Sequence, residues 1–402
     1  MHNSIVFTVD SISGLRAWAT REDRVLIART TLDTPGIDEP PAPTSLAVDA
    51  SEPVEKEPKI AVGFKDGSFS IYTLQQGQPN VFIRICTYPS PSSQAICALA
   101  FSGPYLLTLN SDQLLSLYKI PTEASKISQC APQVLHSLGS SVVRPPLSLS
   151  MRTTSGNVIA SIAYALPTYF SGWTVGIQEM RLSLSGELIE SRLATAVDKH
   201  YHSLSGHLSA SSPSTRSSSP SPERPQNSVP LGGPVYSKPT SLSYTHPYLL
   251  VSHPDNTLTL YLVTSTSSSL SIGPGSRLWG HTSSVSGAHV GGKGKAVSVS
   301  RLGNELRVWE LEGGLGSSTA RRRLLAGELS IQVRPERAAA TGDSNTLSQV
   351  TSKRGFGLGL ALDHRFDDTS ITRGWVGFDE ENVIVLQEKS QGTQALVVYD
   401  FT

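Results

Sequence analysis

The sequence has few cysteines, no net charge and no long apolar run, and each absence excludes a class of protein. It contains only 3 cysteines, without CxxC spacing, which argues against a disulfide framework and a zinc site. Lys+Arg and Asp+Glu number 33 each, so there is no overall attraction to nucleic acid or an anionic membrane. No apolar run reaches the roughly 18 residues that span a bilayer, and the first residues do not resemble a signal peptide.

These absences lead to four expectations about the chain and its surroundings. We expect no nucleic-acid partner, no membrane partner and a location in the cytoplasm, the nucleus or both. The three cysteines, Cys86, Cys97 and Cys130, are expected to be buried, reduced thiols.

Catalytic motifs are also missing: no G-x-S-x-G elbow and no H-E-x-x-H occurs. Residues 287–293 resemble the start of a phosphate-binding loop, but Gly294 stands where Ser or Thr must hold magnesium. Residues 295–300 then alternate like a strand instead of starting a helix. His200 and His202 have no clear third metal ligand. We therefore predict a protein that is not an enzyme and that has no cofactor and no metal.

What the sequence does contain is a recurring short pattern: an apolar residue, any residue, an apolar residue and an aromatic residue. Each copy follows a polar turn, such as "KDGS" at 65–68, and another apolar stretch. Two apolar strands around a polar turn predict a β-hairpin, and Asp, Asn and Gly suit the turn. The pattern occurs at 15–18, 69–72, 115–118, 258–261, 306–309 and 396–399.

A seventh hairpin is predicted at residues 157–184, where alternation is present but the aromatic signature is blurred. The long interval between residues 118 and 261 leaves room for it, since a four-stranded blade takes about 40–45 residues. The 33 glycines and 26 prolines suit many short strands joined by turns. The sequence therefore predicts an all-β, seven-bladed β-propeller that forms one domain over residues 1–402.

One unit carries a specific resemblance. Gly280-His281, Ser298 and Trp309-Glu310 are similar to the Gly-His pair, strand serine and Trp-Asp pair of the WD-repeat β-propeller family. The resemblance implies a buried hydrogen-bond network of His281, Ser298 and Trp309, completed in that family by an Asp in the hairpin turn. Gly303-Asn304 occupies that turn here, so the network is expected to be incomplete.

Two segments depart from globular composition. Residues 196–235 are rich in Ser, Pro and Gly and have few large apolar groups, which predicts a disordered insertion between blades. Within it Ser212, Ser219 and Ser221 precede prolines, and we expect phosphorylation by a proline-directed kinase there; the alternative is a passive linker. Residues 334–355 are predicted to be a flexible loop.

The two ends of the chain predict incomplete blades. Residues 4–10 and 14–19 resemble the second and third strands of a first blade, and 382–389 and 395–401 those of the last. The innermost strand of the first blade and the outermost strand of the last are therefore expected to be missing. One hypothesis is that an upstream segment of the native protein supplies both; the alternative is an open or differently closed ring.

The layout is similar to the propellers of F-box/WD proteins, the substrate receptors of cullin-type ubiquitin ligases. The resemblance implies a module, monomeric within its complex, that binds proteins or peptides, including phosphorylated ones, through arginines such as Arg16 and Arg307. No F-box is present, so the adaptor is expected to bind only through a missing upstream segment. One alternative is a scaffold of another complex, in trafficking or chromatin assembly. The other, ranked below it, is a propeller enzyme.

Overall fold

A computed structural model of the chain describes most of the predicted strands. The residues that it describes are 5–20, 25–33, 40–49, 51, 57–77, 79–89, 93–121, 132–139, 143–154, 156–168, 172–196, 237–300, 305–311, 330–333, 375–378, 382–388 and 394–400. All regular elements in these ranges are strands, and none of the ranges contains a helix that could cross a membrane.

The strands form seven antiparallel sheets of consecutive strands, here called blades A to G. Blade A contains β1 (Ile5–Asp10), β2 (Gly14–Ala19) and β3 (Leu26–Thr30). Blade B contains β4 (Pro43–Val48), β5 (Lys59–Phe64), β6 (Phe69–Gln75) and β7 (Val81–Tyr88). Blade C contains β8 (Ile96–Ser102), β9 (Tyr105–Asn110), β10 (Leu114–Lys119) and β11 (Gln133–Gly139). Blade D contains β12 (Arg144–Thr153), β13 (Asn157–Thr168), β14 (Gly172–Ser183) and β15 (Leu188–Thr195).

The remaining three blades follow in chain order. Blade E contains β16 (Ser241–Thr245), β17 (Tyr248–Ser252), β18 (Leu258–Ser265), β19 (Leu270–Ile272) and β20 (Ser276–Leu278), with β19 and β20 both paired to β18. Blade F contains β21 (Val285–Val290), β22 (Lys295–Ser300), β23 (Leu306–Glu310) and β24 (Ser330–Val333). Blade G contains β25 (Trp375–Phe378), β26 (Asn382–Glu388) and β27 (Gln394–Asp400).

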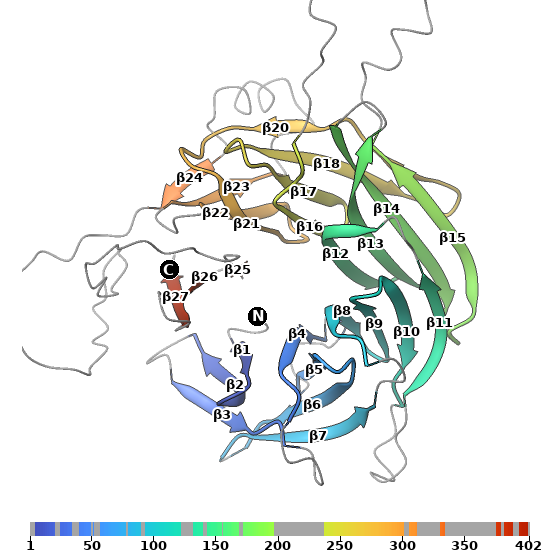
Figure 1. Cartoon of the computed structure of the whole chain (residues 1–402), viewed down its shortest axis with the longest axis vertical. Helices are drawn as coiled ribbons and strands as arrows, with labels where there is room; N and C mark the ends of the chain where they lie inside the picture. Colours follow the sequence, from blue (N-terminus) through green and yellow to red (C-terminus); the bar gives the residue numbers. More distant parts are fainter. Residues whose placement is uncertain are drawn as a thin grey trace, which may run out of the picture.

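Figure 1 shows the sheets arranged around one axis, with β4, β8, β12, β16, β21 and β25 innermost. The chain is a seven-bladed β-propeller, as the sequence predicted. The blurred hairpin at residues 157–184 is the central pair of blade D, β13 and β14. Residues 295–300, after the near-match to a phosphate-binding loop, form strand β22, which excludes the helix that such a loop requires.

Blades A and G have three strands each. The aromatic residue of the recurring pattern lies in the third strand of blades B, C, E and F, and in β2 and β27 of blades A and G. By this equivalence blade A has a second, third and fourth strand, and blade G a first, second and third. The described residues thus provide no innermost strand for blade A and no outermost strand for blade G, in agreement with the sequence analysis.

In blades B to F both faces are buried, because each face packs against a neighbouring blade. Successive side chains of a strand point to opposite faces. On β6, Phe69 and Ile71 join the apolar cluster between blades B and C. Tyr72 and Leu74, one residue out of phase, join the cluster between blades A and B. This is why the apolar residues of a third strand lie on both of its faces.

Six apolar clusters fill the spaces between successive blades, from A–B to F–G. The described residues form no such cluster between G and A. Trp18, on the face of blade A toward that seam, is half-buried. Of its equivalents, Tyr72, Tyr118, Trp309 and Tyr399 are buried, and Tyr261 of blade E is half-buried as well.

Glycine is required at one tight turn of blade A. Gly14 has a φ of +73°, and a Cβ there would lie 2.1 Å from the carbonyl oxygen of Thr30 on the next strand. Only a residue without a side chain fits this approach.

One cysteine expectation is wrong. Cys86 is buried, but Cys97 is exposed. The register of β8 shifts between Ile96 and Ala98, so Cys97 is the extra residue of a β-bulge and lacks a cross-strand neighbour to cover it. Cys130 lies outside the described residues.

Several predicted features lie outside the described residues as well. They are the insertion at 196–235, with Ser212, Ser219 and Ser221, the histidines at 200 and 202, and the loop at 334–355. The exception is Ala196, whose amide donates to the carbonyl oxygen of Val175, 2.9 Å away.

Candidate functional site

The structure brings His281, Ser298 and Trp309 of blade F together in its interior. Trp309 Nε1 donates to Ser298 Oγ over 2.8 Å, and His281 Nε2 lies 2.6 Å from the same oxygen. All three residues are buried. The serine on the central strand β22 thereby ties the loop that enters the blade to the strand β23.

The network includes a carboxylate that the sequence analysis missed. Glu305, 3% exposed, accepts hydrogen bonds from the backbone N and Oγ1 of Thr282, each over 2.9 Å. Oε1 of Glu305 accepts a hydrogen bond from Nε of Arg307 over 3.0 Å. His281 Nδ1 lies 3.5 Å from Oε2, the oxygen that Thr282 binds. Glu305 thus adds a carboxylate that the sequence analysis did not foresee, whereas His281 Nδ1 has no hydrogen bond of normal geometry among the described residues.

The sequence analysis missed this carboxylate because the Glu side chain is longer than that of Asp. The sequence analysis looked for an Asp at 303–304, which lie outside the described residues, whereas the carboxylate comes from the residue just before β23. The extra methylene lets Glu305 reach the loop from this later position. His281, Thr282, Ser298, Glu305, Arg307 and Trp309 are called the blade F network below.

The charge states in this network follow from burial and hydrogen bonding. Burial lowers the pKa of His281 to about 4, so the ring is neutral at pH 7. Burial raises the pKa of Glu305, but the hydrogen bonds from Thr282 and the neighbouring His281 and Arg307 outweigh it and hold this pKa below its ordinary value. Glu305 is therefore the ionised partner.

Blade E carries a related arrangement of different residues. His253 Nε2 lies 2.9 Å from Thr259 Oγ1 in the interior. At the surface Asp255 pairs with Arg277, whose guanidinium lies over the ring of Trp279, 5.0 Å from its centroid. Trp279 is 60% exposed, unusual for so large an apolar side chain.

The two arginines proposed from the sequence occupy equivalent positions, the second residues of the recurring pattern in β2 and β23. Arg16 pairs with Asp10, and its side chain is 26% exposed. Arg307 is held by Glu305 and by Ser330 Oγ, 3.0 Å away, and is 13% exposed. Each is bound within its own blade, and no contact joins them. Arg16 is thus the more accessible to a partner.

The acidic partners of Arg16, Arg277 and Arg307 lie at one end of the ring. All blades have the same inner-to-outer strand order, so their turns between second and third strands lie at the same end, here called the upper end. Asp10, Asp255 and Glu305 belong to or border such turns.

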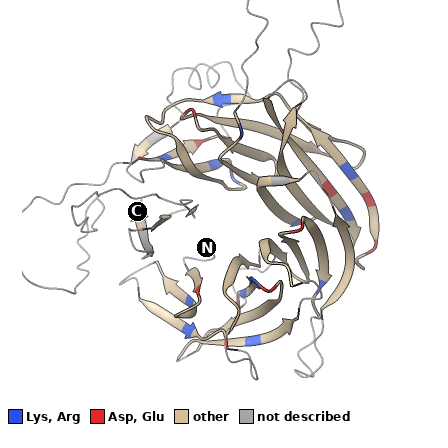
Figure 2. Ribbon diagram, in the orientation of Figure 1, with Lys and Arg blue, Asp and Glu red and all other residues tan. Residues whose placement is uncertain are grey.

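Figure 2 shows basic and acidic residues scattered over the blades and not gathered on one strand.

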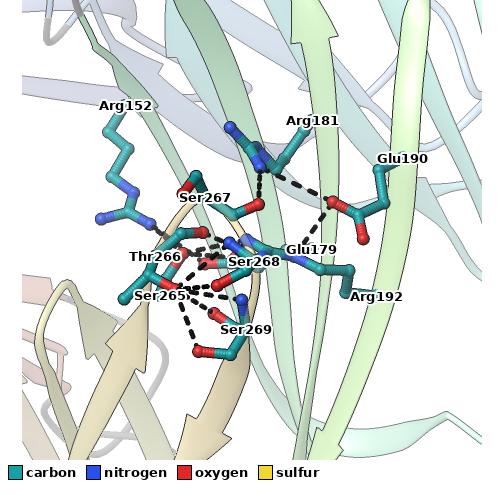
Figure 3. A network of polar contacts seen from close by, with 10 residues as sticks. All are labelled: Arg152, Glu179, Arg181, Glu190, Arg192, Ser265, Thr266, Ser267, Ser268 and Ser269. Carbon is teal, nitrogen blue, oxygen red and sulfur yellow. Dashed lines mark hydrogen bonds and ion pairs between the residues drawn. The ribbon is translucent and has the colours of Figure 1, made fainter.

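A second polar network joins blades D and E (Figure 3). Glu179 on β14 is completely buried, and its two oxygens accept from Arg152 over 3.2 Å and Arg192 over 3.1 Å. Ser265 of blade E donates to it over 2.7 Å. A buried carboxylate is tolerated only when paired and hydrogen-bonded in this way.

The turn between β18 and β19 completes this contact. Arg192 donates to the carbonyl oxygen of Thr266 over 2.9 Å, and Arg181 to that of Ser267 over 2.7 Å. Glu190 lies 3.6 Å from Arg181 and 3.7 Å from Arg192. The ten residues of Figure 3, called the D–E network below, are Arg152, Glu179, Arg181, Glu190, Arg192 and Ser265 to Ser269.

None of these clusters has the composition of a catalytic or metal centre. No group of three or more His, Cys, Asp or Glu side chains that could hold a metal ion occurs among the described residues.

Comparison with known proteins gives the family. The family model of the F-box protein pof12 β-propeller matches residues 1–402. The chain belongs to this family. The pof12-type propeller is a WD40-type fold, which usually serves protein interaction without catalysis. No curated protein matches the chain in sequence.

Two solved structures illustrate the likeness in fold. The WD40 β-propeller domain of Doa1 shows 12% sequence identity and a TM-score of 0.41, with 99% of this chain and 89% of that chain covered. Sqt1 of Saccharomyces cerevisiae shows 9% identity and a TM-score of 0.48, covering 100% and 94%.

Replacing Glu305 tests the blade F network of this pof12-type propeller. In Glu305→Gln the carboxylate charge that holds Arg307 and the entering loop is lost, so we expect the free energy of unfolding to fall by about 1–3 kcal/mol. Chemical denaturation measures it. The matched control is Glu310→Gln, at the exposed end of the same strand, with a change of about 0.5 kcal/mol or less. Equal effects in both variants would show that the network does not stabilise the blade.

A second prediction concerns pH. Burial lowers the pKa of both His253 and His281 to about 4, whereas each titrates near 6.5 when the chain is unfolded. Between these values the unfolded state binds more protons, so stability falls as pH decreases from about 6.5 to 4, by up to about 1.4 kcal/mol per pH unit for each histidine. Below about 4 this contribution levels off.

Denaturation of the wild type and of the double variant His253→Gln, His281→Gln at each pH measures this effect. We expect a shallower slope in the double variant between pH 6.5 and 4. An unchanged slope would mean that these two rings do not carry the effect.

Proposed function

We propose that this chain is the substrate-binding propeller of an F-box-type ubiquitin-ligase receptor, and that its role is binding and not catalysis. The observation that carries the proposal is the match of the F-box protein propeller model to all residues from 1 to 402. In such a receptor the F-box recruits the adaptor of a cullin-type ligase, while the propeller selects the protein to be modified. The adaptor would bind a segment outside the propeller described above.

The upper end of the ring is the surface that we assign to the substrate. It presents the exposed Trp279, stacked on Arg277, and the accessible Arg16, stacked on Trp18 at 5.4 Å. Arginine and tryptophan are enriched among the residues that dominate binding energy at protein interfaces. The phosphate of a phosphorylated peptide would replace Asp10 as the ion-pair partner of Arg16, since a phosphate carries more negative charge than one carboxylate.

Arg307 has a different part in this proposal. Glu305 and Ser330 already use its guanidinium, so a substrate would meet it as a fixed positive group at the edge of the surface. Phosphorylation of Ser212, Ser219 and Ser221 would add charge between β15 and β16, and the described ends of these two strands, Thr195 and Ser241, lie at the upper end. The protein would act as a monomer within its complex, in the cytoplasm, the nucleus or both.

The experiment is purification of the endogenous full-length protein through a tag at its carboxyl end. We expect mass spectrometry to identify the adaptor and a cullin in stoichiometric amounts, together with one or more substrate proteins. Arg16→Ala and Trp279→Ala should reduce the recovery of substrates at least fivefold and leave the adaptor unchanged.

Arg84→Ala is the matched control. Arg84 lies on the outer strand of blade B, in another blade from Arg16, and already donates to the carbonyl oxygen of Asp33. This variant should retain both adaptor and substrates. Absence of the adaptor and cullin from the wild-type preparation contradicts the ligase assignment. Substrate recovery that neither Arg16→Ala nor Trp279→Ala changes contradicts the assigned surface.

A further inference from the structure

The D–E network has more positive than negative charge. Its three arginines face two glutamates, and Glu190 lies beyond hydrogen-bonding distance of both its arginines, at 3.6 and 3.7 Å. The carboxylate of Glu179 is already fully used by Arg152, Arg192 and Ser265. One unit of positive charge therefore lacks a close counter-charge in the network.

Hydrogen-bonding capacity is left over at more than one arginine, since Nε of Arg192 also has no hydrogen bond of normal geometry in the described chain; Arg152 is the arginine on the inner strand β12. Its terminal nitrogen Nη2 bonds to Glu179 and Ser265, but its Nε is buried without a hydrogen-bond partner among the described residues. The side chain is 23% exposed, so part of it borders solvent.

Two further side chains, both from blade E, have unpartnered polar atoms near Arg152. They are the hydroxyl of Tyr244 and Nδ1 of His246, both buried without a hydrogen bond of normal geometry in the described chain. Tyr244 is only 3% exposed. Its hydroxyl has Ser161 nearby, and the charges of Glu179 and Arg152 act on it and on His246. Native structures rarely leave such buried groups unsatisfied without a reason.

The three groups have complementary chemistry. The Arg152 Nε–H and the Tyr244 hydroxyl donate, and the His246 ring donates from Nδ1 in one tautomer or when protonated. Buried donors without partners, beside the arginines of the D–E network, suit a ligand that only accepts hydrogen bonds and carries negative charge. Neighbouring inner strands β12 and β16 bring them together across the blade seam.

We propose that the seam between blades D and E binds a compact oxyanion, a carboxylate or a phosphate, through Arg152, Tyr244 and His246. The site lies at the end of the ring opposite the upper end. Arg152 precedes the turn between β12 and β13, and His246 lies in the turn between β16 and β17; both join a first to a second strand. The proposal is independent of the ligase assignment, which concerns the other end.

Thermal unfolding in the presence of inorganic phosphate, acetate or chloride at matched ionic strength tests the proposal. We expect phosphate or acetate, but not chloride, to raise the Tm of the full chain in a saturable manner. A response to phosphate alone assigns the tetrahedral oxyanion, and a response to acetate assigns the carboxylate. A wild-type Tm that rises equally in all three salts overturns the proposal.

Variants locate the site. Arg152→Gln and His246→Gln should each weaken the anion affinity at least tenfold, whereas Arg84→Gln in blade B should leave it unchanged. If Arg152→Gln does not fold, Tyr244→Phe and His246→Gln, which leave the Glu179 pairs intact, replace it. Wild-type affinity in both of these variants contradicts the site.

The His246 ring provides a second measurement. Burial lowers its pKa and so does the charge of Arg152, against an opposing effect of Glu179. A bound anion should raise this pKa by about one unit or more in NMR titrations. No change on addition of saturating phosphate or acetate would count against binding beside this ring.

Discussion

Apolar packing between neighbouring blades is the interaction on which the rest of this structure depends. A blade is a single twisted sheet with two apolar faces, and it cannot bury either face alone. Strand β6 shows the consequence, since Ile71 packs toward blade C and Tyr72 toward blade A. Each blade is therefore stable only between its neighbours, and the ring order fixes which surfaces its turns present to solvent.

Polar groups also lie inside this packing, and the two buried glutamates among them are paired with arginines. Glu305 connects the loop entering blade F to the start of β23, and Glu179 connects blade D to a turn of blade E. The first network acts within a blade and the second across a seam. Both hold turns in place, and turns are where a propeller contacts its partners. The assigned substrate surface and the proposed anion site lie beside these two networks, at opposite ends of the ring.

The fold was predictable from the sequence because hairpins repeat a local pattern. Period-two alternation and turn residues identified seven hairpins, including the blurred one that became β13 and β14. The resemblance to the WD-repeat family identified His281, Ser298 and Trp309, whose hydrogen bonds are now visible. The role of Glu305 was missed because the expected residue was a shorter acid one or two positions earlier. The D–E network was not foreseeable, since Arg152 and Ser265 are 113 residues apart and no local pattern relates them. The greater exposure of the Arg16 side chain compared with that of Arg307 was likewise not foreseeable, because it depends on neighbouring side chains that only the structure shows.

Hydrogen exchange of the native protein, resolved by strand, tests the central role of inter-blade packing most directly. Blades B to F each contribute to two apolar clusters, whereas in the described chain blades A and G each contribute to one. The account predicts the slowest exchange for amides of β9, β13 and β17, and the fastest among second strands for β1 and β26. Protection of β1 and β26 equal to that of β13 would contradict it, because stability would then not follow the packing of neighbouring blades.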